Sequence, residues 1–222
     1  MAALATATAT LVGIRSLTEA APQLLEAIGT ALDWVVGGLW AVDPNGQELR
    51  CVAFWHRDDF PVPAFMASSR ALVYTPGIGV PGRVLQSGQA VWFADVRSEP
   101  HFPRAEAARA EGLHGAFCFP VSSAGKVLAV LEFYSSAVQQ PDNELLTMMD
   151  TVGNLLAQFI ERVQAEAALE RERKFMAALL ENVSEGIVAC DDTGTLTLFN
   201  RAARRTHGLP QAPLPADQWA EH

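Results

Sequence analysis

The glycine-rich segment from Gly77 to Gly82 has the residue spacing of a phosphate-binding loop. It matches the pattern G-x-G-x-x-G, and Asp95 follows about 18 residues after Gly77, at the end of an apolar segment. A dinucleotide-binding loop opens a long helix whose backbone N–H groups face the pyrophosphate. Pro81 removes one of these donors, and Ser87-Gly88 interrupts the chain before a crossover helix of sufficient length could form. We therefore interpret the segment as a glycine-rich turn, with a nucleotide-binding enzyme as the alternative that a nucleotide titration would test.

Other residues that could do chemistry are scattered along the chain. Cys51, Cys118 and Cys190 lie far apart without a C-x-x-C pattern or a histidine cluster, which argues against a disulfide framework and a zinc site. Glu132 lies within an apolar segment and could be a buried acid, but a hydrogen-bonded structural carboxylate is the preferred interpretation. No G-x-S-x-G, H-E-x-x-H or Walker pattern occurs. The sequence predicts no catalytic site, no metal site and no enzymatic activity of its own.

Composition narrows the class of protein. Half of the 222 residues are hydrophobic and 18% are charged, so the chain can bury a core. Its net charge of −9 argues against a nucleic-acid or anionic-membrane binder. No apolar run approaches the roughly 18 residues that a membrane-spanning helix needs. Residues 1–15 lack the basic residue that precedes the apolar part of a secretory signal, so we expect a leader and a cytoplasmic protein.

Hydrophobic periodicity and turn residues predict the elements that must position these side chains. Asp43-Pro44-Asn45-Gly46 has turn chemistry between two apolar segments, and Ser123-Ala124-Gly125 separates a second pair. The predicted elements are a helix over Ser16–Leu32, strands over Val35–Val42 and Leu49–Trp55, one short helix between Arg57 and Val73, one or two helical turns in Val80–Ser87, a strand over Gln89–Val96, a helix over Phe102–Gly112, and strands over Ala116–Ser122 and Val127–Tyr134.

The pattern changes at Pro141. Only Gly153 interrupts the chain before Gly186, which predicts one helix of about 40 residues ending near Asn182. A strand, a turn, a second strand and a short helix follow, over Ile187–Asp191, Asp192-Thr193-Gly194, Leu196–Asn200 and Arg201–Thr206. This last unit is too small to hold a core of its own, because domains rarely fall below about 50 residues. It has the pattern of the opening of a further domain.

Several segments together resemble a known domain family in their order and spacing. They are Pro76–Val84, Gln86–Trp92, Asp95-Val96, Gly112–Phe117 and Val130–Tyr134. They resemble the GAF domains that precede PAS domains in bacterial sensor histidine kinases, over a stretch from about Leu17 to Val163. Residues 182–208, with Glu185-Gly186-Ile187-Val188, Asp192-Thr193-Gly194 and Phe199-Asn200-Arg201-Ala202, are similar to the start of a PAS domain.

The resemblance implies an α+β fold in which helices flank an antiparallel sheet. The domains expected are a leader at 1–15, a GAF sensor domain at 16–140, a long signalling helix at 141–182 whose first half completes the GAF domain, and an incomplete PAS domain at 183–222. It also implies phosphorelay signalling, with a histidine kinase further along a longer chain. Nothing in these residues resembles a phosphoacceptor helix, an ATP-binding kinase domain or a cyclase core.

Members of this family bind varied small molecules in one pocket. Bilin-binding relatives attach the pigment through a cysteine that often directly precedes a histidine, whereas here Leu113 precedes His114, so a covalent bilin is not expected. A haem would need His101 or His114 as its axial ligand, but a lone histidine is more often a polar cap or a packed side chain. The cyclic-nucleotide signature of the family cannot be placed. The identity of the ligand, and whether one exists, therefore stays open.

The pocket residues nominated from the resemblance belong to the strand and helix that bracket the family's cavity. They are Trp92, Phe93, Asp95, His101, Phe102 and His114. Aromatic residues on alternating strand positions are more often simply core, so a filled cavity in a ligand-free scaffold is the competing interpretation.

The long helix carries a possible dimer seam. Its positions alternate in steps of four and three: Leu145, Met149, Val152, Leu156, Phe159 and Val163. The stripe resumes in a displaced register as Leu169, Arg173, Met176, Leu180 and Val183, a stammer. We expect a parallel homodimer, against the alternative that the first seam packs on the chain's own sheet. The chain is therefore predicted to be a sensory and dimerisation module.

Overall fold

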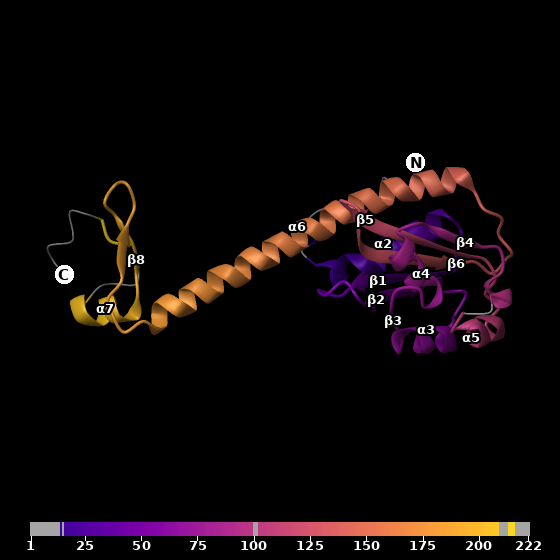
Figure 1. Ribbon diagram of the computed structural model, residues 1–222, viewed down its shortest axis with the longest axis horizontal. Helices are drawn as coiled ribbons and strands as arrows, with labels where there is room; N and C mark the ends of the chain where they lie inside the picture. Colours follow the sequence, from indigo (N-terminus) through magenta and orange to yellow (C-terminus); the bar gives the residue numbers. More distant parts are fainter. Residues whose placement is uncertain (1–13, 15, 100–101, 209–212, 216–222) are drawn as a thin grey trace. The chain divides into compact units, whose positions relative to one another are not determined.

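The computed structural model describes residues 14, 16–99, 102–208 and 213–215, and it divides the chain into two units at 1–163 and 164–222 (Figure 1). The predicted leader lies outside the described residues except for Ile14. Each unit is described by itself. Within the described residues, no helix is both long enough and apolar enough to cross a membrane.

A six-stranded antiparallel sheet forms the centre of the first unit. Its order is β3-β2-β1-β6-β5-β4. The strands are β1 (Val36–Val42), β2 (Leu49–His56), β3 (Val73–Tyr74), β4 (Val91–Phe93), β5 (Ala116–Ser123) and β6 (Lys126–Tyr134). Both predicted hairpins form, as β1–β2 and β5–β6. The mostly apolar β6 lies in the middle of the sheet, between β1 and β5.

The first hairpin is closed by an aspartate. Asp43 Oδ1 accepts hydrogen bonds from the N–H groups of Gln47 at 2.7 Å and Glu48 at 2.9 Å. The bond from Glu48 is the main reason that the pKa of Asp43 is lowered. Gly46 takes the left-handed conformation, with φ of 75°, that a side chain would disfavour.

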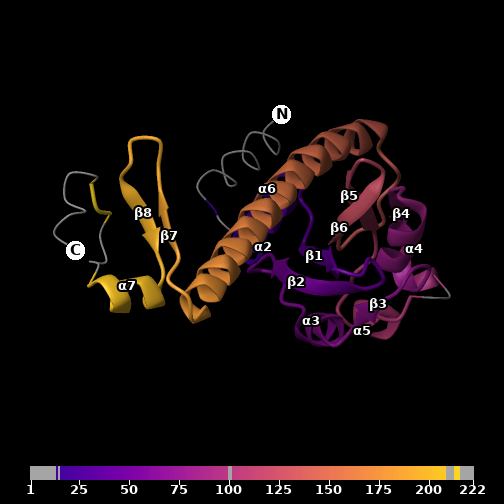
Figure 2. The ribbon, with the colours of Figure 1, turned by 60° about the vertical axis from the view of Figure 1, so that its left-hand side comes forward.

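Helices cover both faces of the sheet (Figure 2). Helix α2 (Leu17–Ala31) and the first half of α6 (Asn143–Asn182) cover what we name the α2–α6 face. Helices α3 (Pro63–Arg70), α4 (Gly79–Ser87) and α5 (Ala105–Ala110) cover the opposite α3–α5 face. Side chains alternate between the two cores along a strand: Phe117 and Phe119 of β5 face the first, and Cys118 faces the second. This is the α+β fold that the sequence predicted.

Two predicted elements are shorter than expected. The strand predicted over Gln89–Val96 is reduced to β4 because Asp95 caps a 3₁₀ helix, η1 (Val96–Ser98). The helix predicted over Phe102–Gly112 is reduced to α5, which ends where Gly112 turns left-handed with φ of 72°. Pro103 lacks a backbone N–H and stands just outside the helix.

Helix α6 contributes its first half to the first unit. Asp142 begins it, because its Oδ1 accepts hydrogen bonds from the N–H groups of Glu144 at 2.8 Å and Leu145 at 3.2 Å. Gly153 lets the helix approach β5, since a Cβ there would lie 3.1 Å from the Pro120 carbonyl oxygen. Residues 164–179 of the helix are exposed.

The second unit contains a hairpin and a short helix. Strands β7 (Val188–Cys190) and β8 (Leu196–Phe199) pair antiparallel, and α7 (Arg201–His207) follows. Asn200 joins these elements to the end of α6: its Oδ1 accepts from the Ile187 and Ala203 N–H groups, and its amide donates to the Leu180 and Glu185 carbonyls. The core of this unit is small, with Leu196, Phe199, Ala203 and Leu214 buried.

Candidate functional site

The nominated residues Trp92 and Phe93 point to opposite faces of the sheet. Trp92 packs on the α2–α6 face, with its ring centroid 5.6 Å from that of Trp34 and 5.1 Å from that of Phe117. Phe93 packs on the α3–α5 face, where the Arg83 guanidinium lies 5.9 Å from its ring centroid. Consecutive strand residues alternate in direction, so one cavity cannot take both side chains.

Asp95 and His114 meet beside β4. Asp95 binds the Arg97 guanidinium through both carboxylate oxygens, at 2.9 and 2.7 Å, and its Oδ2 lies 3.5 Å from His114 Nδ1. The hydrogen bonds from the Arg97 side chain are the main reason that the pKa of Asp95 falls from 3.8 to about 2. The carboxylate also accepts from the Arg97 N–H and so caps η1. These hydrogen bonds hold η1 in place directly after β4.

Phe102 and His101 are the remaining two nominated residues. Phe102 is buried on the α3–α5 face and stacks on Tyr134 with ring centroids 6.2 Å apart. His101 lies outside the described residues. The structure thus brings Asp95 together with His114, whereas Trp92 packs on the α2–α6 face and Phe102 packs on the α3–α5 face.

A buried ion pair occupies the core of the α3–α5 face. Arg104 and Glu132 are each 1% exposed. Arg104 Nη1 donates to Glu132 Oε1 at 2.7 Å, and Nη2 donates to Oε2 at 2.6 Å. Nη1 also donates to Ser69 Oγ, and Nη2 donates to the Tyr134 hydroxyl. Trp40 Nε1 donates to Glu132 Oε1 at 2.9 Å and the Tyr134 hydroxyl donates to Oε2 at 2.7 Å, so three residues donate hydrogen bonds to the carboxylate.

Aromatic rings surround the buried guanidinium. Their centroids lie between 4.6 and 5.7 Å from the Arg104 guanidinium carbon, and they belong to Trp40, Phe65, Tyr74, Phe102 and Tyr134. Burial by itself would lower the pKa of Arg104, but the Glu132 charge holds that pKa well above its ordinary value. Within the described part of the chain, Arg104 Nε and the Tyr74 hydroxyl have no hydrogen-bond partner. The interior of the α3–α5 face around Arg104 is therefore filled by the chain's own side chains.

The sequence alone identifies Glu132 of this pair but not Arg104. Glu132 was identified as a carboxylate in an apolar strand, with a hydrogen-bonded structural role as the preferred interpretation, and the structure gives it that role. Arg104 was missed, because it sits beside an alanine-rich segment whose charged residues alternate as they do on a solvated helix. A buried carboxylate needs a cationic partner, which is the signal that could have prompted the search.

The glycine-rich loop is closed on itself. Gly77 N–H donates to the Gly82 carbonyl at 2.8 Å, and Ile78 N–H donates to the Thr75 carbonyl at 3.0 Å. A Cβ on Gly82 would lie 2.2 Å from the Thr75 carbonyl oxygen, so close backbone packing requires this glycine. Helix α4 is nine residues long, and the sheet is antiparallel. These features agree with a glycine-rich turn and do not fit a dinucleotide loop.

The six predicted seam residues pack within their own unit. Leu145, Met149, Val152, Leu156 and Phe159 are buried in the α2–α6 core, and Val163 packs at its margin. In the structure these side chains contact the chain's own sheet and α2, which is the alternative packing that the sequence left open. Past Val163, α6 exposes Leu169, Phe175, Met176 and Leu179, which are 48–62% accessible.

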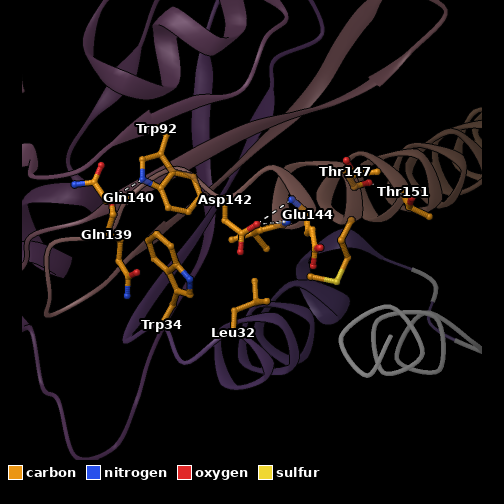
Figure 3. Close-up of a pocket in the computed structure, with 11 residues that line it drawn as sticks. Leu32, Trp34, Trp92, Gln139, Gln140, Asp142, Glu144, Thr147 and Thr151 are labelled. Carbon is orange, nitrogen blue, oxygen red and sulfur yellow. Dashed lines mark hydrogen bonds between the residues drawn. The ribbon is translucent and has the colours of Figure 1, made fainter.

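A cavity of about 640 Å³ lies on the α2–α6 face where α6 begins (Figure 3). Trp34 and Trp92 lie next to each other on one side of the cavity, and Asp142 and Glu144 lie at the start of α6 (Figure 3). Its further lining residues include Leu32, Gln139, Gln140, Thr147, Met148 and Thr151. Of the five nominated residues that the structure describes, Trp92 alone lines this cavity.

The cysteines are poorly placed for redox chemistry in the GAF-like unit. Burial raises the pKa of Cys51 to about 11, and it raises the pKa of the buried Cys118 well above its ordinary value. Cys190 is exposed, in the second unit. Among the described residues, no three His, Cys, Asp or Glu side chains are grouped to hold a metal ion.

Comparisons with known proteins agree with this architecture. The family model described as "GAF domain" matches residues 14–161, and one described as "PAS domain" matches residues 174–221. A protein of Dictyostelium discoideum, "Hybrid signal transduction histidine kinase I", is 40% identical over 73 residues, which are 32% of this chain and 4% of that protein. The chain thus spans a small fraction of that relative.

Solved structures show the same fold at low identity. The GAF domain of a phosphoenolpyruvate-protein phosphotransferase from Coxiella burnetii has a TM-score of 0.63 at 19% identity, over 75% of this chain and 95% of that one. Free methionine-R-sulfoxide reductase from Neisseria meningitidis, in complex with its substrate, has a TM-score of 0.60 at 17% identity, over 74% of this chain and 89% of that one. At these identities the likeness is one of fold.

Proposed function

The chain belongs to the GAF domain family, and from that premise we propose that it is the sensory input and dimerisation module of a bacterial multidomain signalling protein of the sensor histidine kinase type. GAF and PAS domains are regulatory domains, and their pairing here supports a signalling module. The observation that carries the proposal is α6. One uninterrupted helix, Asn143–Asn182, begins in the core of the GAF domain and ends within residues 174–221, the stretch that matches the PAS domain model.

Dimerisation is assigned to the part of α6 beyond Val163. Leu169 and Met176 are seven residues apart, Phe175 and Leu179 flank the same side, and all four are exposed in the single chain. A second copy of the helix would cover this side in parallel register. The six positions before it, from Leu145 to Val163, remain with the GAF core.

Gel filtration with light scattering tests the dimer. We expect twice the chain mass for the wild type and the single-chain mass for Leu169→Glu/Met176→Glu, because two buried charges would face each other across the seam. Ala167→Glu/Ala178→Glu places the same charges on the opposite side of the helix and should remain a dimer. A monomeric wild type, or equal loss in both double variants, would remove dimerisation from the proposal.

Ligand binding is assigned to the interior between the sheet and the α3–α5 cover. The second candidate is a ligand-free scaffold, and the filling of this interior by Arg104, Glu132 and five rings favours it. The indole N–H signal of Trp40 distinguishes the two, because this group donates to Glu132 and reports any displacement of Arg104. A library of metabolites screened by this signal should yield a saturable shift if the interior is a sensor, and none if it is a scaffold.

The nucleotide-binding enzyme is the least supported alternative. The N–H groups of Gly77 and Ile78 are already bonded within the loop, so they are not free to bind phosphate. Titration with ATP and NAD should give no saturable binding. For the output of the whole protein, sequencing of the coding region beyond His222 is the direct test: a histidine kinase domain is expected after a completed PAS domain. A cytoplasmic location for the module belongs to the same proposal.

A further inference from the structure

The cavity at the start of α6 has the size and lining of a small-molecule site. Its volume of about 640 Å³ falls within the range of roughly 300–1,000 Å³ usual for ligand pockets. It lies on the α2–α6 face of the sheet, so it is separate from the Arg104–Glu132 interior on the other face. Three elements line the cavity: the end of α2, strand β4 and the first turns of α6.

One wall of the cavity is aromatic and held in place. The Trp34 and Trp92 rings stand edge to face at 82°. Trp92 Nε1 donates to the Gln139 carbonyl at 2.8 Å, which fixes the orientation of its ring. Leu32 and Met148 add apolar surface. A flat or aliphatic group of a ligand would pack on this wall, and a cation beside it would be attracted to the rings.

The rest of the lining carries negative charge and hydrogen-bonding groups. Asp142 and Glu144 both line the cavity, and none of the described lining residues is Lys, Arg or His. Asp142 caps α6 with Oδ1, which leaves its Oδ2 for a ligand. The Glu144 side chain is exposed, and among the described residues no Lys, Arg or His forms an ion pair with it. Charge complementarity therefore selects a cation.

We propose that this cavity is a binding site for a small organic cation that carries an aromatic or aliphatic body. The body packs against Trp34 and Trp92, and the ammonium group lies toward Asp142 and Glu144 (Figure 3). Because Asp142 caps α6 and Glu144 lies in its first turn, the occupant contacts the start of the helix to which signal transmission is assigned. The site is additional to the sensory interior of the proposed function.

Indole N–H signals in a ¹H–¹⁵N spectrum of the full chain test the proposal. The probes are 2-phenylethylammonium, its neutral analogue 2-phenylethanol and the anion phenylacetate, which share one ring. Saturable shifts of the Trp34 and Trp92 signals are expected with the ammonium probe, at an affinity about tenfold or more above that of the alcohol. The Trp40 signal, which reports the other face, should not move.

Charge variants give the matched comparison. Asp142→Asn keeps a capping oxygen, and Glu144→Gln keeps the shape of the side chain, so α6 should still begin at the same residue. Each variant is expected to lower the affinity for the ammonium probe about threefold to tenfold. Asp150→Asn, on the same helix but outside the cavity lining, should leave this affinity unchanged.

Several outcomes would overturn the cation site. These are equal binding of the alcohol and the ammonium probe, unchanged affinity in Asp142→Asn and Glu144→Gln, or no saturable shift of Trp34 and Trp92 at millimolar probe. A shift confined to Trp40 would likewise overturn it while supporting a ligand in the α3–α5 interior, so the two proposals fail independently.

Discussion

The Arg104–Glu132 pair puts two opposite charges in a core that excludes water. Both side chains are 1% exposed, and their three hydrogen-bonding neighbours come from α3, β1 and β6. Desolvation makes such a pair a weak source of net stability, yet removing one partner leaves a buried charge alone. The pair thus links α3 and the start of α5 to strands β1 and β6 of this face.

A double-mutant cycle tests this account of the pair. Arg104→Met or Glu132→Gln alone should lower the free energy of unfolding by about 3–5 kcal/mol, because each leaves an uncompensated charge. The double variant removes both charges and keeps an acceptor for Trp40 Nε1, so it should lose clearly less than the sum of the two. Urea unfolding gives all three values; additive losses would show that the two side chains are not coupled.

Asp95 makes a pH-dependent contribution to stability. Its pKa is about 2 in the folded chain against an ordinary 3.8, so its contribution is present above about pH 4 and is lost as the pH falls toward 2. Since the side chain is partly exposed, we expect about 1 kcal/mol. The difference in unfolding free energy between wild type and Asp95→Asn should therefore shrink between pH 5 and pH 3. A difference that stays constant over this interval would contradict the assignment.

At the scale of elements, local chemistry predicted most of the fold. The two hairpins, α2, α6 and the β7–β8–α7 unit follow from turn residues, caps and periodicity that act within a few residues. The sequence overextended β4 and α5, where Asp95 and Gly112 end them by side-chain capping and backbone conformation. It also could not name the partner of the first α6 seam, because a four-three spacing fits a sheet as well as a second helix.

The candidate site was predicted less well than the fold, for a physical reason. A pocket is made by residues distant in sequence, and alternation along β4 sends Trp92 and Phe93 to opposite faces. The resemblance could not show that Arg104 fills the interior of the α3–α5 face. The cavity at the start of α6 depends on how Trp34 and Trp92 meet, which no local pattern records.

The turn before α4 depends on Gly82. Its missing Cβ leaves room for the Thr75 carbonyl oxygen, which would otherwise lie 2.2 Å away. Gly82→Ala should therefore lower the free energy of unfolding by about 1–3 kcal/mol, as overpacking usually does. Gly46→Asn is the control, since its surroundings are open and asparagine tolerates a positive φ. Thermal unfolding compares the two, and equal small effects would show that the loop can relax around a methyl group.

At the scale of the whole molecule, α6 has two different environments along its length. Up to Val163 its apolar side is part of the GAF core, whereas residues 164–179 leave Leu169 and Met176 exposed. The displaced registers on either side of this point would let a small rotation at the GAF end change the phase of the second half, if that half pairs with another copy. Transmission of a signal through α6 therefore requires residues 164–182 of two copies to pair in parallel.

Disulfide cross-linking at single positions tests the parallel pairing of residues 164–182 most directly. The native cysteines are first replaced, and one cysteine is then placed on the predicted seam (Leu169, Met176 or Leu180) or on the opposite side (Arg171, Lys174 or Ala178). In a parallel pair, equivalent seam positions come within the roughly 7 Å Cα separation that a disulfide requires, and opposite positions do not. We predict cross-linking at the seam at least tenfold faster than on the opposite side. Equal rates on both sides would contradict the parallel dimer and the transmission of a signal through it.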